Sequence, residues 1–115
     1  MYLHKQWEAA INDNNLDAVV GCYAPTALLL PTVSALLCDT PEKIRDYFVA
    51  FLSKKPQVIW IDSYINEFSD GYVQLGRYEF RFDNGMPVIA RYTFAYKKID
   101  GLFNIVSHHS SRNPD

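Results

Sequence analysis

The chain has 115 residues with a formal net charge of −2, and 49% of them are hydrophobic and 21% charged. This length predicts one domain covering residues 1–115, and the composition is that of a folded protein, which excludes intrinsic disorder. The basic residues are scattered and form no stripe, so we expect no nucleic-acid partner.

Membrane segments and export signals are not expected either. The most apolar stretch, Ala27 to Cys38, is interrupted by Pro31 and Thr32 and is too short to span a bilayer, which takes about 20 apolar residues. Glu8 falls where a signal peptide would have its basic or apolar region. We therefore expect a cytoplasmic protein without a membrane partner.

The two cysteines, Cys22 and Cys38, have no motif spacing and are expected to be buried thiols. The chain also has no zinc-binding spacing, no glycine-rich phosphate loop and no recognisable Ser-His-Asp order. We therefore predict neither a metal site nor a cofactor.

Two short helices are predicted at the start of the chain. In the first, which contains a solvated His4, apolar residues recur at helical spacing until an Asn/Asp cluster at 12–15 ends it and caps the next helix. The second carries the apolar residues from Leu16 to Tyr23 and ends at Pro25. A short buried strand, Ala27 to Leu30, follows between two prolines.

A third helix is predicted between Thr40 and Pro56. Thr40 is a suitable N-cap, Pro41 takes the first helical position, and Glu42 lies in the first turn. The apolar stripe of this helix consists of Ile44, Tyr47, Phe48, Phe51 and Leu52.

The second half of the chain is predicted to be an antiparallel sheet. From Gln57 onward the hydrophobic period changes to two, and turn sequences at 69–71, 83–85 and 100–101 divide the segment into four long strands. Helices followed by such a sheet predict an α+β fold in which the helices cover one sheet face.

The loop lengths decide which polar residues share a face of this sheet. If Asp83-Asn84-Gly85 is a three-residue loop, Arg77 lies directly opposite Arg91, whereas a two-residue Asn84-Gly85 turn places the two arginines on opposite faces. The same three-residue length around Ile99-Asp100-Gly101 would set Arg91 opposite His109.

Two arginines that face each other repel, and their burial requires an anion. Glu79 is two residues from Arg77 and therefore on the same face, which makes it the internal candidate. A bound carboxylate is the external candidate, because a guanidinium group grips a carboxylate with two hydrogen bonds. Either solution is compatible with the sequence.

The adjacent residues His108 and His109 point to opposite sides of the last strand and cannot chelate one metal together. Each is expected to be a hydrogen-bonded histidine of the core or of an interface. His109 is in addition the candidate for a polar group or proton carrier beside the arginines.

Several aromatic side chains share one face of the predicted sheet. The helices can cover only one side, and on a monomer a set this apolar would be a large exposed patch, so we predict that it contacts a second copy of the chain. This aromatic face consists of Tyr78, Phe80, Phe82, Tyr92, Phe94 and Tyr96.

Five segments in order carry a family resemblance. They are Trp7-Glu8-Ala9-Ala10, Tyr23 to Thr32, Ile44 to Leu52, Ala90 to Phe94, and His108 to Ser111. Together they resemble the SnoaL-like branch of the nuclear transport factor 2-like superfamily, and within it most the association (hub) domain of calcium/calmodulin-dependent protein kinase II and its stand-alone bacterial relatives. The resemblance covers nearly the whole chain and implies a cone-shaped, cystatin-like fold with N-terminal helices packed on a curved antiparallel sheet.

The resemblance also implies a site and a mode of assembly. It implies a deep cavity between sheet and helices, lined by arginines, and assembly through the outer sheet face into a homodimer or a higher ring-like oligomer. Arg77 and Arg91 match the positions of the family's cavity arginines, which favours the three-residue loop. Apart from the resemblance, helical spacing places Tyr47 in the core, and its hydroxyl, like those of Tyr23 and Tyr64, is a candidate to face the cavity.

These observations predict a homo-oligomerising domain whose arginine-lined cavity binds a small carboxylate. The alternative is a stand-alone SnoaL-like enzyme of the isomerase, cyclase or hydrolase type, acting on a small organic molecule, with His109 or a cavity carboxylate as acid or base. Two nearby arginines would lower the pKa of Glu79 and make it a weak base, which argues against the enzyme. A plain small-molecule carrier is a third possibility.

Overall fold

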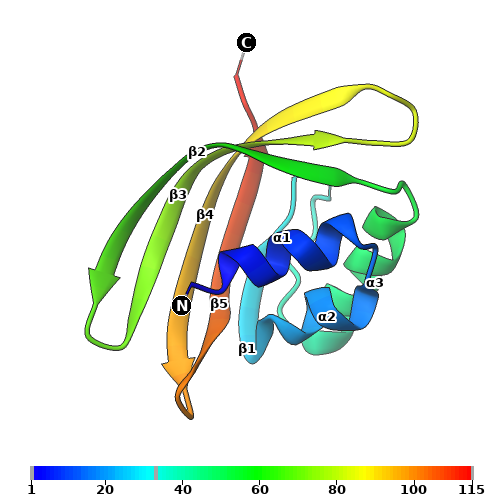
Figure 1. Ribbon diagram of the computed structural model, residues 1–115. Helices are drawn as coiled ribbons and strands as arrows, with labels where there is room; N and C mark the ends of the chain where they lie inside the picture. Colours follow the sequence, from blue (N-terminus) through cyan, green and yellow to red (C-terminus); the bar gives the residue numbers. More distant parts are fainter. Residues whose placement is uncertain (1, 33, 115) are drawn as a thin grey trace.

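The structure of the protein is a computed structural model that describes residues 2–32 and 34–114. Its helices are α1 (His4–Asn12), α2 (Leu16–Gly21) and α3 (Pro41–Leu52). All three precede the long strands and lie on the concave side of one curved sheet (Figure 1). The predicted α+β class, with N-terminal helices packed on a curved sheet, is confirmed.

The helix boundaries follow from local capping. The side chain of Asn15 accepts a hydrogen bond from the backbone N–H of Ala18 at 3.2 Å, and Thr40 accepts one from Lys43 at 3.2 Å. Helix α2 ends at Gly21, two residues earlier than predicted. The chain turns there because the carbonyl of Cys22 already accepts a hydrogen bond from Ile105 of the sheet, at 2.8 Å.

The sheet has five strands in the order β1-β5-β4-β3-β2. They are β1 (Tyr23–Leu30), β2 (Gln57–Phe68), β3 (Gly71–Arg81), β4 (Pro87–Ile99) and β5 (Leu102–Arg112). Strands β2 to β5 form the predicted antiparallel meander, and β1 adds to the edge parallel to β5. Strand β1 is longer than predicted, and the shift in its pairing between Tyr23 and Leu28 accommodates Pro25, which has no N–H to donate.

The two hairpin loops fix the register of the polar residues. Gly85 has a φ of +81°, Arg81 pairs with Pro87, and Arg77 therefore pairs with Arg91, as the three-residue alternative predicted. The β4–β5 turn is shorter than predicted, with only Asp100 and Gly101 between Ile99 and Leu102.

Between Ala95 and Tyr96 the pairing of β4 with β5 shifts again, in the same direction as the shift caused by the shorter turn. Arg91 therefore pairs with Ser111, and His109 pairs with Thr93. The prediction that Arg91 lies directly opposite His109 is wrong, although the two residues remain on one face, on neighbouring strands.

The aromatic face is buried inside the protomer, so the prediction that it forms the interface is wrong. The exposed fractions of its central members lie between 0% for Phe94 and 5% for Phe80. Trp7 of α1 lies edge-on to Phe94, with 5.1 Å between the ring centroids, and Phe51 of α3 packs in the same way on Phe80 at 5.1 Å. The helices cover this face because burying the more apolar side of the sheet removes more apolar surface from water. The buried set is Tyr78, Phe80, Tyr92, Phe94 and Tyr96, while Phe82 is half-buried beside Phe51.

We expect Phe94→Ala to lower the free energy of unfolding by about 3–5 kcal/mol, because it leaves a cavity at the centre of the core. Urea unfolding followed by circular dichroism measures the change. Leu102→Ala is the matched control, because Leu102 is 71% exposed and its truncation is expected to cost no more than about 0.5 kcal/mol. Equal losses for the two variants would contradict the assignment of Phe94 to the core.

Candidate functional site

The outer face of the sheet carries a groove of about 440 Å³. It holds three of the five residues predicted to bind a ligand, namely Arg77, Arg91 and His109. These residues point away from the helices and are exposed, so the prediction that they line a cavity between sheet and helices is wrong. They share the face opposite the buried aromatic one because strand side chains alternate.

Arg77 is neutralised by Asp62 of the neighbouring strand β2. Its Nε and Nη2 atoms donate to Oδ2 of Asp62 at 3.1 and 2.8 Å, and its backbone N–H donates to Oδ1 at 2.7 Å. These hydrogen bonds hold the pKa of the Asp62 carboxyl below its ordinary value. Glu79, the predicted internal partner, instead accepts a hydrogen bond from Nε of Arg81 at 2.6 Å.

A bulge in β2 brings Asp62 to the outer face. The pairing shifts between Trp60, opposite Tyr78 on the inner face, and Asp62, opposite Arg77 on the outer face. Gly76 permits this close approach, because a Cβ atom there would lie 2.2 Å from the carbonyl oxygen of Asp62. Strict alternation from Trp60 assigns Asp62 to the inner face, which is why reasoning from the sequence did not pair it with Arg77.

Arg91 is an arginine of the groove that forms no ion pair with a described residue. None of the ion pairs between described residues includes Arg91, whereas Arg77 and Arg81 each have an acidic partner. Arg91 lies between Arg77 on β3 and Ser111 on β5. The groove therefore has one arginine available to a carboxylate, where the sequence predicted two.

Tyr47 is separated from the arginines by the sheet. It lies on α3, where its ring stacks on Phe51 at 5.7 Å, and it lines a pocket of about 630 Å³ on the inner side. Burial raises the pKa of its hydroxyl. The structure thus divides the predicted ligand set between two sites on opposite sides of the sheet.

His108 lies on the inner side of the sheet, where it bridges two tyrosines. Its Nδ1 atom is 2.8 Å from the hydroxyl of Tyr23 and its Nε2 atom is 3.1 Å from the hydroxyl of Tyr78. Burial, with a smaller contribution from His109, lowers the pKa of His108 to about 3. The prediction of a hydrogen-bonded core histidine is confirmed for His108.

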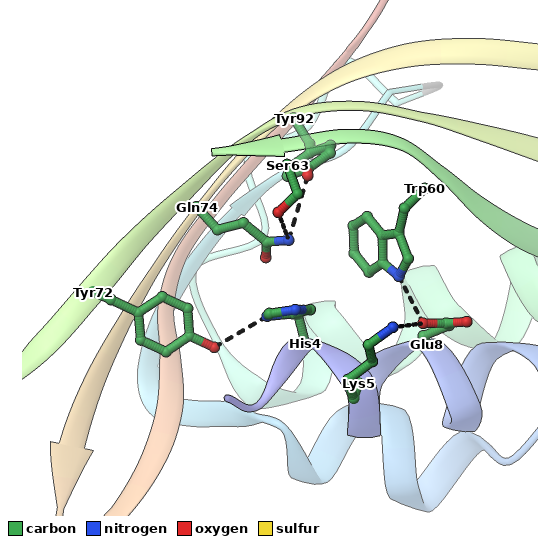
Figure 2. A network of polar contacts seen from close by, with 8 residues as sticks. All are labelled: His4, Lys5, Glu8, Trp60, Ser63, Tyr72, Gln74 and Tyr92. Carbon is green, nitrogen blue, oxygen red and sulfur yellow. Dashed lines mark hydrogen bonds and ion pairs between the residues drawn. The ribbon is translucent and has the colours of Figure 1, made fainter. Parts of the chain in front are cut away.

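A separate polar cluster lies between α1 and the sheet (Figure 2). His4 is only 9% exposed and its Nδ1 atom lies 3.5 Å from the hydroxyl of Tyr72, so the prediction of a solvated His4 is wrong. Nε1 of Trp60 donates to Glu8 at 2.7 Å. The cluster ties α1 to the edge of the sheet.

The fully buried amide of Gln74 completes this cluster. Its nitrogen donates to Ser63 at 3.0 Å and to Tyr92 at 3.3 Å, and its oxygen accepts from Tyr96 at 2.8 Å. Because every polar atom of Gln74 has a partner, we assign it a structural role.

Cys22 and Cys38 are free and buried, as predicted. Within residues 2–32 and 34–114, no three His, Cys, Asp or Glu side chains are grouped as a metal site requires. None of the helices in these same ranges has the length and apolar character needed to cross a bilayer.

The fold is that of nuclear transport factor 2-like and cystatin-like proteins. A nuclear transport factor 2-like protein of Pseudomonas putida superposes with a TM-score of 0.87 at 14% identity, over 98% of this chain and 83% of that chain. A Shewanella frigidimarina protein described as a ketosteroid isomerase gives a TM-score of 0.81 at 14% identity, over 95% of this chain and 91% of that chain. At such identities the likeness defines the fold alone.

The family is defined by a closer match. The model of the calcium/calmodulin dependent protein kinase II association domain matches residues 1–114. A Xanthomonas campestris protein assigned as such a domain is 40% identical over 98% of this chain and 84% of that chain, with a TM-score of 0.92. The chain therefore belongs to the calcium/calmodulin dependent protein kinase II association domain family. A search of curated proteins finds no match.

We expect the free energy of unfolding to decrease as the pH falls from about 6.5 toward 3. The unfolded chain takes up a proton on His108 near pH 6.5, whereas the folded chain, with its lowered pKa, does not until about pH 3. Histidine NMR should show the His108 ring still neutral at pH 5, and urea unfolding of His108→Gln should show a shallower pH dependence. A midpoint near pH 6.5 for His108 would contradict the assignment.

Proposed function

We propose that the protein is a homo-oligomerising association domain that assembles through the outer face of its sheet. Membership of the association-domain family supports self-association. The observation that carries the proposal is the row of side chains that crosses all five strands on this face. The row consists of Leu30, His109, Thr93, Leu75 and Tyr64.

This row and its neighbours form an apolar surface that the protomer does not cover. Six of its large apolar side chains, from four different strands, have exposed fractions between 40% and 65%. They are Leu28, Leu30, Ile59, Tyr64, Leu75 and Ile89. A broad apolar surface with charged groups set into it is typical of an interface between identical copies, where one patch meets another of the same kind.

Assembly through this face gives the groove a function. A second copy would cover Arg91 and remove it from water, and an unneutralised buried guanidinium is costly. Asp62 is already engaged by Arg77, so the anion must come from outside the groove. A small carboxylate held by Arg91 meets this need and makes the groove a ligand site at the interface.

An enzyme acting on a small molecule has less support. His109, the expected acid or base, lies on the outer face, away from the inner pocket. His108, which does lie on the inner side, has a pKa lowered to about 3 and is therefore a weak base near pH 7.

We expect Leu75→Glu to convert the oligomer to protomers of 13.2 kDa, because assembly would bury the new carboxylates in an apolar interface. Light scattering coupled to gel filtration measures the mass, and circular dichroism confirms that the variant is folded. Val49→Glu is the matched control: Val49 is 53% exposed on α3, on the opposite side of the sheet, and its substitution should leave the mass unchanged. A wild-type protein that is strictly monomeric would contradict the proposal.

We expect malonate to raise the melting temperature of the wild-type oligomer and to lose this effect in Arg91→Ala, because the variant lacks the free guanidinium. Differential scanning fluorimetry measures the shift. Arg81→Ala is the control, since Arg81 lies on the same face but is paired with Glu79. An undiminished shift in Arg91→Ala would exclude Arg91 as the carboxylate ligand and leave assembly as a separate question.

A further inference from the structure

The pocket on the inner side of the sheet has a largely apolar lining. It is bounded by α3, by the β3–β4 hairpin and by the segment that follows β1, and its volume is about 630 Å³. The backbone N–H of Asp83 donates to the carbonyl of Lys54 at 3.1 Å, which joins the hairpin to the end of α3 and holds two walls together. The apolar lining includes Phe51, Phe80, Phe82 and Val88, and Tyr47 adds a ring that carries a hydroxyl.

A chain of hydrogen bonds runs through the core toward this pocket. Which atom donates in its first bonds follows from which atoms carry a proton. Nε1–H of Trp7 can only donate, and it donates to the hydroxyl oxygen of Tyr23 at 3.3 Å. The proton of Tyr23 then goes to Nδ1 of His108, its one remaining partner among the described residues. A neutral imidazole that accepts at Nδ1 carries its proton on Nε2.

The same direction continues to the pocket. Nε2–H of His108 donates to the hydroxyl oxygen of Tyr78 at 3.1 Å, and Tyr78 donates its own proton to Oγ of Ser110 at 2.8 Å. The hydroxyl of Ser110 then donates to Oγ1 of Thr32. Each hydroxyl has one proton, so the hydroxyl proton of Thr32 is left over.

Thr32 lines both the pocket and the narrow space between the pocket and His108. None of the hydrogen bonds between described residues takes its last proton. The chain therefore ends in a hydroxyl that donates a hydrogen bond at the wall of an apolar pocket. The charged side chains of the lining are Lys54 and Asp83, one of each sign, so the pocket has no net preference for an anion.

We propose that this pocket binds a flat, apolar molecule with one uncharged hydrogen-bond acceptor, such as an aryl ketone, and that the Thr32 hydroxyl recognises the acceptor. The aromatic and aliphatic walls supply the affinity for the flat body of the ligand. The ordered hydrogen-bond chain supplies the recognition of the acceptor, because it leaves the Thr32 proton available to the pocket.

The first experiment compares two probes of the same shape. 2-Acetylnaphthalene carries a carbonyl acceptor, whereas 2-isopropenylnaphthalene has a CH₂ group in its place. We expect the ketone to bind wild-type protein about fivefold to tenfold more tightly, the effect of one hydrogen bond, as measured by ligand-observed NMR titration. Equal affinities, or no binding of the ketone, would overturn the proposal.

Variants separate the pocket wall from the hydrogen bond. Thr32→Val keeps the shape but removes the donor, so we expect the two probes to bind it equally. Val88→Trp fills the pocket and should abolish binding of both probes. Arg81→Ala, on the other side of the sheet and outside the proposed carboxylate site, should change neither affinity. Preference for the ketone that survives in Thr32→Val would contradict the role of Thr32.

The direction of the chain can be tested without a variant. Nitrogen-15 NMR of the histidine rings distinguishes a protonated from a bare ring nitrogen, and we expect His108 to carry its proton on Nε2. A proton on Nδ1 would reverse the chain, remove the free donor from Thr32 and overturn the proposal.

Discussion

The packing of α1 against the inner face of the sheet is the contact on which the rest of the structure depends. Trp7 is 1% exposed and stands at its centre, where its ring contacts Tyr78, Phe94 and His108 with centroid separations of 5.1 to 6.0 Å. This contact buries the aromatic face within the protomer. Its burial determines that the opposite, mixed face of the sheet is the one left to meet solvent or a second copy.

Burying so many tyrosines and a histidine creates a second requirement, since each hydroxyl and ring nitrogen on the inner side needs a partner. No buried side-chain nitrogen or oxygen of the described residues lacks a hydrogen bond. The requirement is met by hydrogen bonds that run between strands and helices, so the inner side is both apolar and ordered in its proton positions. The donor that Thr32 presents to the inner pocket is a consequence of that order.

The outer side of the sheet differs, because water screens its charges and its ion pairs form between neighbouring residues. Asp62 neutralises Arg77 and Glu79 neutralises Arg81, which leaves Arg91 as the position where an external anion is needed once the face is covered. The two sides of one sheet thus supply two separate sites. Assembly and a carboxylate belong to the outer site, and an apolar acceptor belongs to the inner one.

The sequence by itself determined the helices and the four long strands, because capping residues and period-two patterns are local signals. The residues alone left the length of the 83–85 loop open, and the family resemblance favoured the length that pairs Arg77 with Arg91. The sequence did not determine which face the helices cover or that Asp62 is the partner of Arg77. The bulge in β2 reverses the alternation, and the choice of the covered face depends on the total apolar area that distant segments bury together. The total buried apolar area depends on how distant segments pack, so only the tertiary structure determines it.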